Sequence, residues 1–96
     1  MKHCILAKYK EHVTAEQKTA LLDEIREVFS PLLQEEGIHA LKVIPNCIDR
    51  SNRWDVLIRI DMNPEALPAY DESLPHKRWK EQYGPLLEKK AIFDYE

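Results

Sequence analysis

Four histidines supply the side chains in this chain that are best suited to proton transfer or metal binding: His3, His12, His39 and His76. The unperturbed pKa of histidine, about 6.5, lets the imidazole gain or lose a proton near neutral pH. No two of the four have the spacing of a helical metal-binding motif such as HExxH. The sequence therefore predicts no metal site, and it favours loop or surface positions for His12 and His39.

The two cysteines are the other candidates for chemistry. Cys4 lies in a strand-like segment and Cys47 in a loop, without the CxxC spacing of redox or zinc sites. We therefore expect two reduced thiols and no disulfide.

Charge and hydropathy disfavour two classes of partner. The chain has 14 Lys and Arg residues against 17 Asp and Glu, a net charge of -3 and no long basic run, so nucleic-acid binding is not predicted. It has no apolar run of about 18 residues and no signal-peptide core, so we expect a cytoplasmic protein with no membrane partner. The run Glu35-Glu36 is typical of solvated surface.

The elements that would position these side chains begin with a strand and a helix. Residues 3–9 alternate between two faces, as a half-buried strand does. Thr14 and Gln17 have the spacing of a capping box, which predicts a helix start, and an apolar stripe follows at helical spacing. Pro31 lacks an amide donor and should break this helix, and Gly37 is suited to end the turn that follows.

Two strands, a second helical region and a last strand come next. Residues 38–44 are β-prone and residues 54–61 alternate clearly, so we expect a hairpin. Asn63 precedes a proline in the pattern of a helix start, which predicts a helix to about residue 70, and Pro75 opens a further helical stretch. Residues 91–95 alternate again as a last strand.

The order strand, helix, strand, strand, helix, strand is that of the ferredoxin-like α+β fold, βαββαβ. We expect one domain over residues 1–96, because a chain of about 100 residues rarely builds two cores. The first and third strands should lie at the centre of an antiparallel sheet, with both helices on one face.

The helices leave the other face of this sheet open, and the residues expected there are too apolar for a fully solvated surface. They are Cys4, Leu6, Leu57 and Ile92, beside the charged Lys8, Arg59, Asp61 and Asp94. A second copy related by a two-fold axis would cover this face and pair its charges, so the sequence predicts a homodimer. The residues expected at its interface are Leu6, Leu57, Arg59 and Ile92. The alternative is a monomer with an amphipathic open face.

Four segments of the chain resemble parts of one family. Residues 2–10 are similar to its opening strand, residues 52–55 to the entry of its third strand, and residues 85–88 with 92–96 to its ending. Over essentially its whole length the chain resembles the stress-responsive A/B barrel (Dabb) family. This resemblance implies a dimeric α+β barrel with a pocket in each subunit between the helices and the sheet.

The resemblance also implies a candidate site. Tyr70 and His76 match a Tyr and the second His of the family's His-Pro-x-His segment. A plant member that closes an aromatic polyketide ring by aldol chemistry uses this pair, with a His matching His3 nearby. Here the segment reads Ser73-Leu74-Pro75-His76, so its first His is missing, and Val56 stands where the cyclase has a further His.

Aldol ring closure requires a base that removes a proton alpha to a carbonyl and a donor that stabilises the enolate. His76 fits the first role and Tyr70 the second, without a metal or an organic cofactor. The residues expected to line the substrate pocket are His3, Ile5, Val56, Ile58, Trp79 and Phe93. The same residues could instead form an ordinary core, with the Tyr and the His serving only to pack.

Three classes of function fit these residues. The first is a homodimer that binds a small apolar or oxo-acid ligand, with its specific role unassigned. The second is a cofactor-free lyase, cyclase or isomerase of the polyketide-cyclase type, with His76 as base and Tyr70 as donor. The third is a structural stress protein without catalysis. We favour the first; an open cavity bordered by His3, Tyr70 and His76 would favour the first two over the third.

Overall fold

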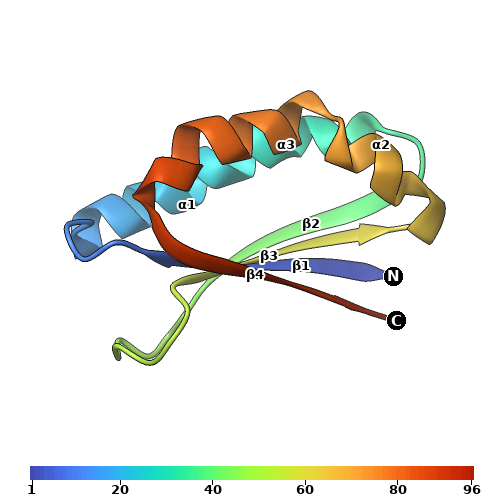
Figure 1. The fold of residues 1–96 in the computed structure, drawn as a ribbon. Coiled ribbons are helices and arrows are strands. Elements are labelled where there is room, and N and C mark those ends of the chain that lie inside the picture. Colours follow the sequence, from blue (N-terminus) through green and yellow to red (C-terminus); the bar gives the residue numbers. More distant parts are fainter.

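The computed structural model describes residues 1–96 and consists of an antiparallel sheet covered by helices on one face (Figure 1). The strands are β1 (Lys2–Tyr9), β2 (Ile38–Pro45), β3 (Val56–Met62) and β4 (Leu87–Tyr95), in the order β2-β3-β1-β4. β1 and β3 are therefore central, as the sequence predicts. Burial along β3 alternates residue by residue, because successive side chains point to opposite faces.

The long helix α1 (Ala15–Phe29) begins at the predicted capping box. The Gln17 amide donates to Oγ1 of Thr14 at 3.2 Å, and the Thr14 amide donates to Oε1 of Gln17 at 2.7 Å. These two bonds satisfy backbone donors that a helix start otherwise leaves free. The buried stripe Leu21, Ile25 and Phe29 then faces the sheet.

After α1 the chain tightens into a 3₁₀ turn, η1 (Ser30–Gln34), which begins next to Pro31. Gly37 follows with φ at +83°, a left-handed conformation that glycine adopts without steric cost. A Cβ on Gly37 would lie 3.2 Å from the Cβ of Ala66, so the residue also permits a close approach between two segments. Its carbonyl accepts from the Asn63 amide at 2.7 Å.

The second helical region consists of short pieces: η2 (Pro64–Ala66), α2 (Leu67–Asp71), α3 (Leu74–Arg78), the π-helical turn η3 (Trp79–Tyr83) and η4 (Gly84–Leu86). Ser73 caps α3 by accepting from the His76 amide at 3.3 Å. Asn63 precedes η2 as expected, but its side chain caps nothing and pairs with Nε2 of His39 at 2.9 Å. None of the helices has the length and apolar character needed to cross a membrane.

The last strand differs from the sequence-based expectation in the faces of its side chains. Ile92 pairs with Ile5, Phe93 with Cys4 and Asp94 with His3. Paired residues on neighbouring antiparallel strands point to the same face. Ile92 and Asp94 therefore lie on the helix side, not on the open face.

Phe93 was expected to line a pocket on the helix side, but it lies on the open face. Its side chain is 64% exposed. The open face keeps Leu6, Leu57 and Arg59 as expected, because Arg59 pairs with Cys4 and Leu57 with Leu6 in the neighbouring strand. It also carries Tyr95, which pairs with Lys2.

Candidate functional site

Tyr70 lies between two histidines that come from distant parts of the chain. Its ring centroid is 5.2 Å from that of His3 on β1, in an edge-to-face arrangement, and 4.8 Å from that of His76 on α3. Tyr70 is only 2% exposed. The structure thus brings together the three side chains that the family resemblance singled out.

His3 is held by the last strand. Its Nδ1 lies 2.5 Å from Oδ1 of Asp94, and its side chain is buried. An ionised carboxylate can only accept, so Nδ1 carries the proton in this bond. Asp94 thereby sets the orientation of the ring that packs against Tyr70.

His76 is oriented by backbone and hydroxyl groups around the turn between α2 and α3. Its Nδ1 lies 2.8 Å from the Asp71 carbonyl oxygen, which can only accept, so Nδ1 donates and the neutral ring keeps a free lone pair on Nε2. The Ser73 hydroxyl donates to the Tyr70 carbonyl at 2.6 Å and accepts from the His76 amide. A base with its lone pair on Nε2 is the form that general-base chemistry needs.

The hydroxyl of Tyr70 has no hydrogen-bond partner and is shielded from solvent. Burial, and to a smaller extent the nearby Asp71 carboxylate, raises the pKa of Tyr70 well above its ordinary value. The phenol therefore stays neutral and keeps a proton that it can donate. An unsatisfied buried donor costs about 1–3 kcal/mol, which an incoming acceptor would recover.

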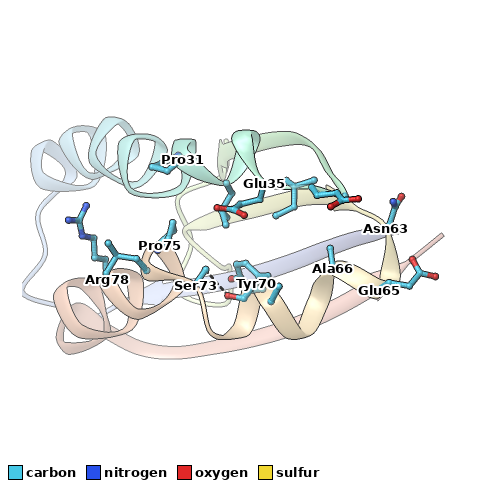
Figure 2. A pocket seen from close by; sticks show the side chains of 15 residues that line it. Pro31, Glu35, Asn63, Glu65, Ala66, Tyr70, Ser73, Pro75 and Arg78 are labelled. Carbon is cyan, nitrogen blue, oxygen red and sulfur yellow. Dashed lines mark hydrogen bonds between the residues drawn. The ribbon is translucent and has the colours of Figure 1, made fainter.

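A cavity of about 610 Å³ lies beside Tyr70, between the end of α1 and the α2–α3 region (Figure 2). Its walls come from η1, the start of β2, η2, α2 and α3. The lining residues are Pro31, Leu32, Glu35, Glu36, Gly37, Ile38, Asn63, Glu65, Ala66, Ala69, Tyr70, Ser73, Leu74, Pro75 and Arg78. Neither His3 nor His76 is among them, so only Tyr70 of the three aromatic side chains borders the cavity.

Comparison with known proteins shows which family the chain belongs to. The model of the Stress responsive A/B Barrel Domain matches residues 1–96. The chain belongs to the Dabb family. No curated protein matches it.

Solved structures agree on the fold of this Dabb chain. A dimeric protein of unknown function with a ferredoxin-like fold from Bacteroides fragilis is 22% identical, with a TM-score of 0.79 over 99% of this chain and 93% of that one. A Dabb family protein from Mesorhizobium loti is 13% identical, with a TM-score of 0.74 over 99% and 93%. A hydroxynitrile lyase from Passiflora edulis is 16% identical, with a TM-score of 0.70 over 98% and 89%.

Four of the residues expected to line a pocket form the core of this Dabb domain instead. Ile5, Val56, Ile58 and Trp79 are fully buried and belong to one apolar cluster. Trp79 packs between Phe29 and Tyr83, with ring centroids 5.7 and 5.9 Å away. The structure therefore places these four residues in an ordinary core, which is the alternative that the sequence left open.

Several lining residues of the cavity escaped the sequence-based interpretation. Glu35 and Glu36 read as solvated surface, and they are exposed, but they also border the cavity. Nothing in the sequence marked Glu65 or Arg78 as a cavity residue; Glu65 fitted only the first turn of a helix. Gly37 was predicted only to end a helical turn, and the structure adds that it permits a close approach to Ala66.

Proposed function

We propose that this Dabb protein is a homodimer that binds a small molecule in the cavity beside Tyr70. The observation that carries the proposal is Tyr70, which borders an open cavity and has a buried hydroxyl without a hydrogen-bond partner. Buried polar groups in folded proteins are nearly always hydrogen-bonded, so an exception at a cavity points to a ligand that supplies the missing partner.

The cavity has both apolar and polar lining residues. Leu32, Ile38 and Ala66 offer apolar contact, while Tyr70 and Asn63 offer a few polar groups that can orient a ligand. Its volume of about 610 Å³ lies in the range of about 300–1,000 Å³ that is usual for small-molecule sites.

An NMR titration with small aromatic carbonyl compounds tests this proposal. Ligand binding should shift resonances of residues around Tyr70, and Tyr70→Phe should weaken it about tenfold, as expected for one lost hydrogen bond to a buried donor. Tyr9→Phe is the matched control, because the Tyr9 hydroxyl is equally buried and unpaired but lies outside this cavity. Binding that Tyr70→Phe leaves unchanged would contradict the proposal.

The dimer is proposed through the open face of the sheet. Phe93 and Tyr95 of β4 and Ile44 of β2 are exposed there as large hydrophobic side chains. They lie on the two edge strands, and Leu6 and Leu57 on the central strands between them share this face. Exposed apolar surface of this kind marks interfaces. The related protein from Bacteroides fragilis is described as dimeric. Sedimentation should give a dimer at micromolar concentration, and a monomer would overturn this part of the proposal.

A second candidate function is a cofactor-free lyase or isomerase. The packing of His76 on Tyr70, and the Nε2 lone pair of His76, support a base and a donor side by side. The Passiflora edulis protein of the same fold is named a hydroxynitrile lyase. We place this second because His76 does not line the cavity.

Cyanide release from an aromatic hydroxynitrile tests the second candidate. The base removes the hydroxyl proton, the bond to the nitrile carbon breaks, and aldehyde and cyanide leave. His76→Gln should lower kcat by about 100-fold or more, with His12→Gln as the control. Turnover that His76→Gln leaves intact would reject His76 as the base.

A structural stress protein is the outcome if no ligand binds. In any of these roles the reduced thiols of Cys4 and Cys47 suit a reducing compartment such as the cytoplasm. Exposed Cys47 would be the thiol that labels first in an intact protein, so alkylation of cell extracts prepared under trapping conditions tests this placement.

A further inference from the structure

The chain between β2 and β3, residues 46–55, forms an arm that projects beyond the sheet. Figure 1 shows this arm on the side of the sheet away from the helices, so it borders the open face. Ile48 in the arm is 44% exposed, and Ile44 just before it is 42% exposed. Ile44 pairs with Leu57, so its side chain points to the open face. The arm therefore extends the apolar surface of the open face beyond the strands.

Hydrogen bonds within the arm fix its shape. Nδ2 of Asn46 donates to the Trp54 carbonyl at 2.8 Å, and Oδ1 of Asn46 accepts from the Ile48 amide at 2.8 Å. The Asn46 amide donates to the Asp55 carbonyl at 3.0 Å, which closes the base of the arm. A segment that is already ordered loses less conformational entropy on binding than a flexible one. The arm is thus prepared to contact a partner.

Two lysines of the sheet hold the arm beside the open face. Nζ of Lys8 on β1 donates to the Ser51 carbonyl at 2.8 Å and to the Arg53 carbonyl at 3.2 Å. Lys89 on β4 is the pairing partner of Lys8, and its Nζ lies 5.1 Å from the centroid of the Trp54 ring. Both positive charges therefore have their partners within the subunit.

The charged pair at the middle of the open face is also internal. Nε and a terminal nitrogen of Arg59 donate to the two carboxylate oxygens of Asp61 at 2.9 and 3.2 Å. The open face therefore does not depend on a second copy to pair these charges, as the sequence had suggested. What it leaves uncovered is apolar surface, and Phe93 is the most exposed of its large apolar side chains.

Resting on the homodimer proposed above, we propose that the arm is a clasp that packs Ile48 on the open face of the second copy. A partner for this surface must itself be apolar and carry no unpaired charge where the two meet, and the open face of another copy meets both conditions. Two-fold symmetry makes the contact twice, since each copy supplies one arm. Apolar contact, and not charge pairing, holds the two copies together.

Ile48→Asp tests the clasp, with Leu33→Asp as the matched control. Leu33 is an apolar residue of η1 with almost the same exposure, 43%, but it lies outside the arm and the open face. Fluorescence-detected sedimentation of a dilution series measures the dissociation constant of the dimer. Ile48→Asp should raise this constant at least about tenfold, because a carboxylate would be buried without a partner. Leu33→Asp should leave it unchanged.

Asn46→Ala tests whether the order of the arm matters. The substitution removes two hydrogen bonds within the arm, so the dissociation constant of the dimer should rise about three- to tenfold. Asn52→Ala is the control in the same arm, because the Asn52 side chain accepts only from its neighbour Arg53. A change from low to high salt should alter the constant of the unmodified protein less than about twofold, since apolar contacts are not screened.

The outcomes distinguish the clasp from the dimer on which it rests. An unmodified protein that is monomeric at micromolar concentration removes both. A dimer that Ile48→Asp or Asn46→Ala leaves as tight as before overturns the clasp and keeps the dimer. A dissociation constant that rises steeply with salt overturns the apolar contact and shows that charge pairing joins the two copies.

Discussion

Nδ1 of His3 lies 2.5 Å from Oδ1 of Asp94, and this contact joins the first strand to the last across 91 positions of the sequence. The pair lies on the helix side of the sheet, where His3 packs edge-on against Tyr70. A charge-assisted hydrogen bond between β1 and β4 therefore fixes the position of His3 in the candidate site. The C-terminal strand borders no part of the cavity, but its Asp94 orients the His3 ring that packs against Tyr70.

Asp94→Asn should lower stability by about 1 kcal/mol. The variant keeps an acceptor for His3 but loses its charge, and charge-assisted hydrogen bonds exceed neutral ones by about that much. Because the Asp94 side chain is 39% exposed, solvent screening limits the effect. Urea unfolding at one fixed protein concentration measures it, with Asp23→Asn in the exposed pair with Arg26 as the control. If both variants lower the free energy of unfolding equally, the burial of His3 adds nothing to the strength of its bond with Asp94.

The order of the elements was predictable because its signals are local. The capping box of Thr14 and Gln17 and the proline at position 31 act within a few residues, so the start and the end of α1 can be read from sequence. Asn63 shows the limit, because it takes the predicted N-cap position of η2 but its side chain does not cap the helix. Its side chain pairs with His39 on β2, a competitor that becomes a neighbour only after folding.

The faces of β4 could not be predicted for a different reason. Ile92 and Phe93 are both large and apolar, so alternation alone does not say which of them faces the core. Pairing with Ile5 and Cys4 decides it, and the register shifts between Lys8 and Tyr9. The expected homodimer face keeps its place on the sheet, but its contribution from β4 is changed.

The candidate site likewise has one part that could be predicted from the sequence and one part that could not. The cluster of Tyr70 with His3 and His76 followed from family resemblance, and the structure brings it together. The cavity did not follow, because its walls come from segments whose approach depends on tertiary packing. Exposed acids such as Glu35 have no periodicity that would mark them as lining residues.

Gly37→Ala should destabilise the fold by about 1–2 kcal/mol and change the cavity. The new Cβ would have to adopt a φ of +83° and would lie 3.2 Å from Ala66, another lining residue. Gly84→Ala is the matched control, since a Cβ there meets nothing within 4 Å. Thermal unfolding should separate the two by about 4–8 °C for each kcal/mol, and similar melting temperatures would refute the close approach.

Titration of the Tyr9 phenol should lower the free energy of unfolding between about pH 10 and pH 12. Burial, with smaller effects from Asp55, Tyr83 and Glu24, raises the pKa of Tyr9 from 10.0 to about 12. In this window the unfolded chain has released the phenol proton and the folded chain retains it, so the stability present below pH 10 is lost as pH rises.

Urea unfolding at pH 9 and pH 11 measures this loss, with Tyr9→Phe as the comparison. The unmodified protein should lose more stability than the variant over this interval, by about 1 kcal/mol. At neutral pH the variant should be as stable as the unmodified protein or more so, because the Tyr9 hydroxyl it removes has no partner. Identical pH profiles would mean that Tyr9 is more solvated than its 4% exposure implies.

Phe93→Glu and Ile92→Glu should differ in their effect on assembly, although the two residues are adjacent and similarly exposed, at 64% and 52%. Phe93 pairs with Cys4 on the open face, so a carboxylate there would be buried in the interface of the proposed dimer. Ile92 pairs with Ile5 and points to the helix side. Sedimentation at micromolar concentration should give a monomer for Phe93→Glu and a dimer for Ile92→Glu, both with native circular dichroism. The reverse result would mean that the subunits associate through the helix side of the sheet, where the candidate site lies.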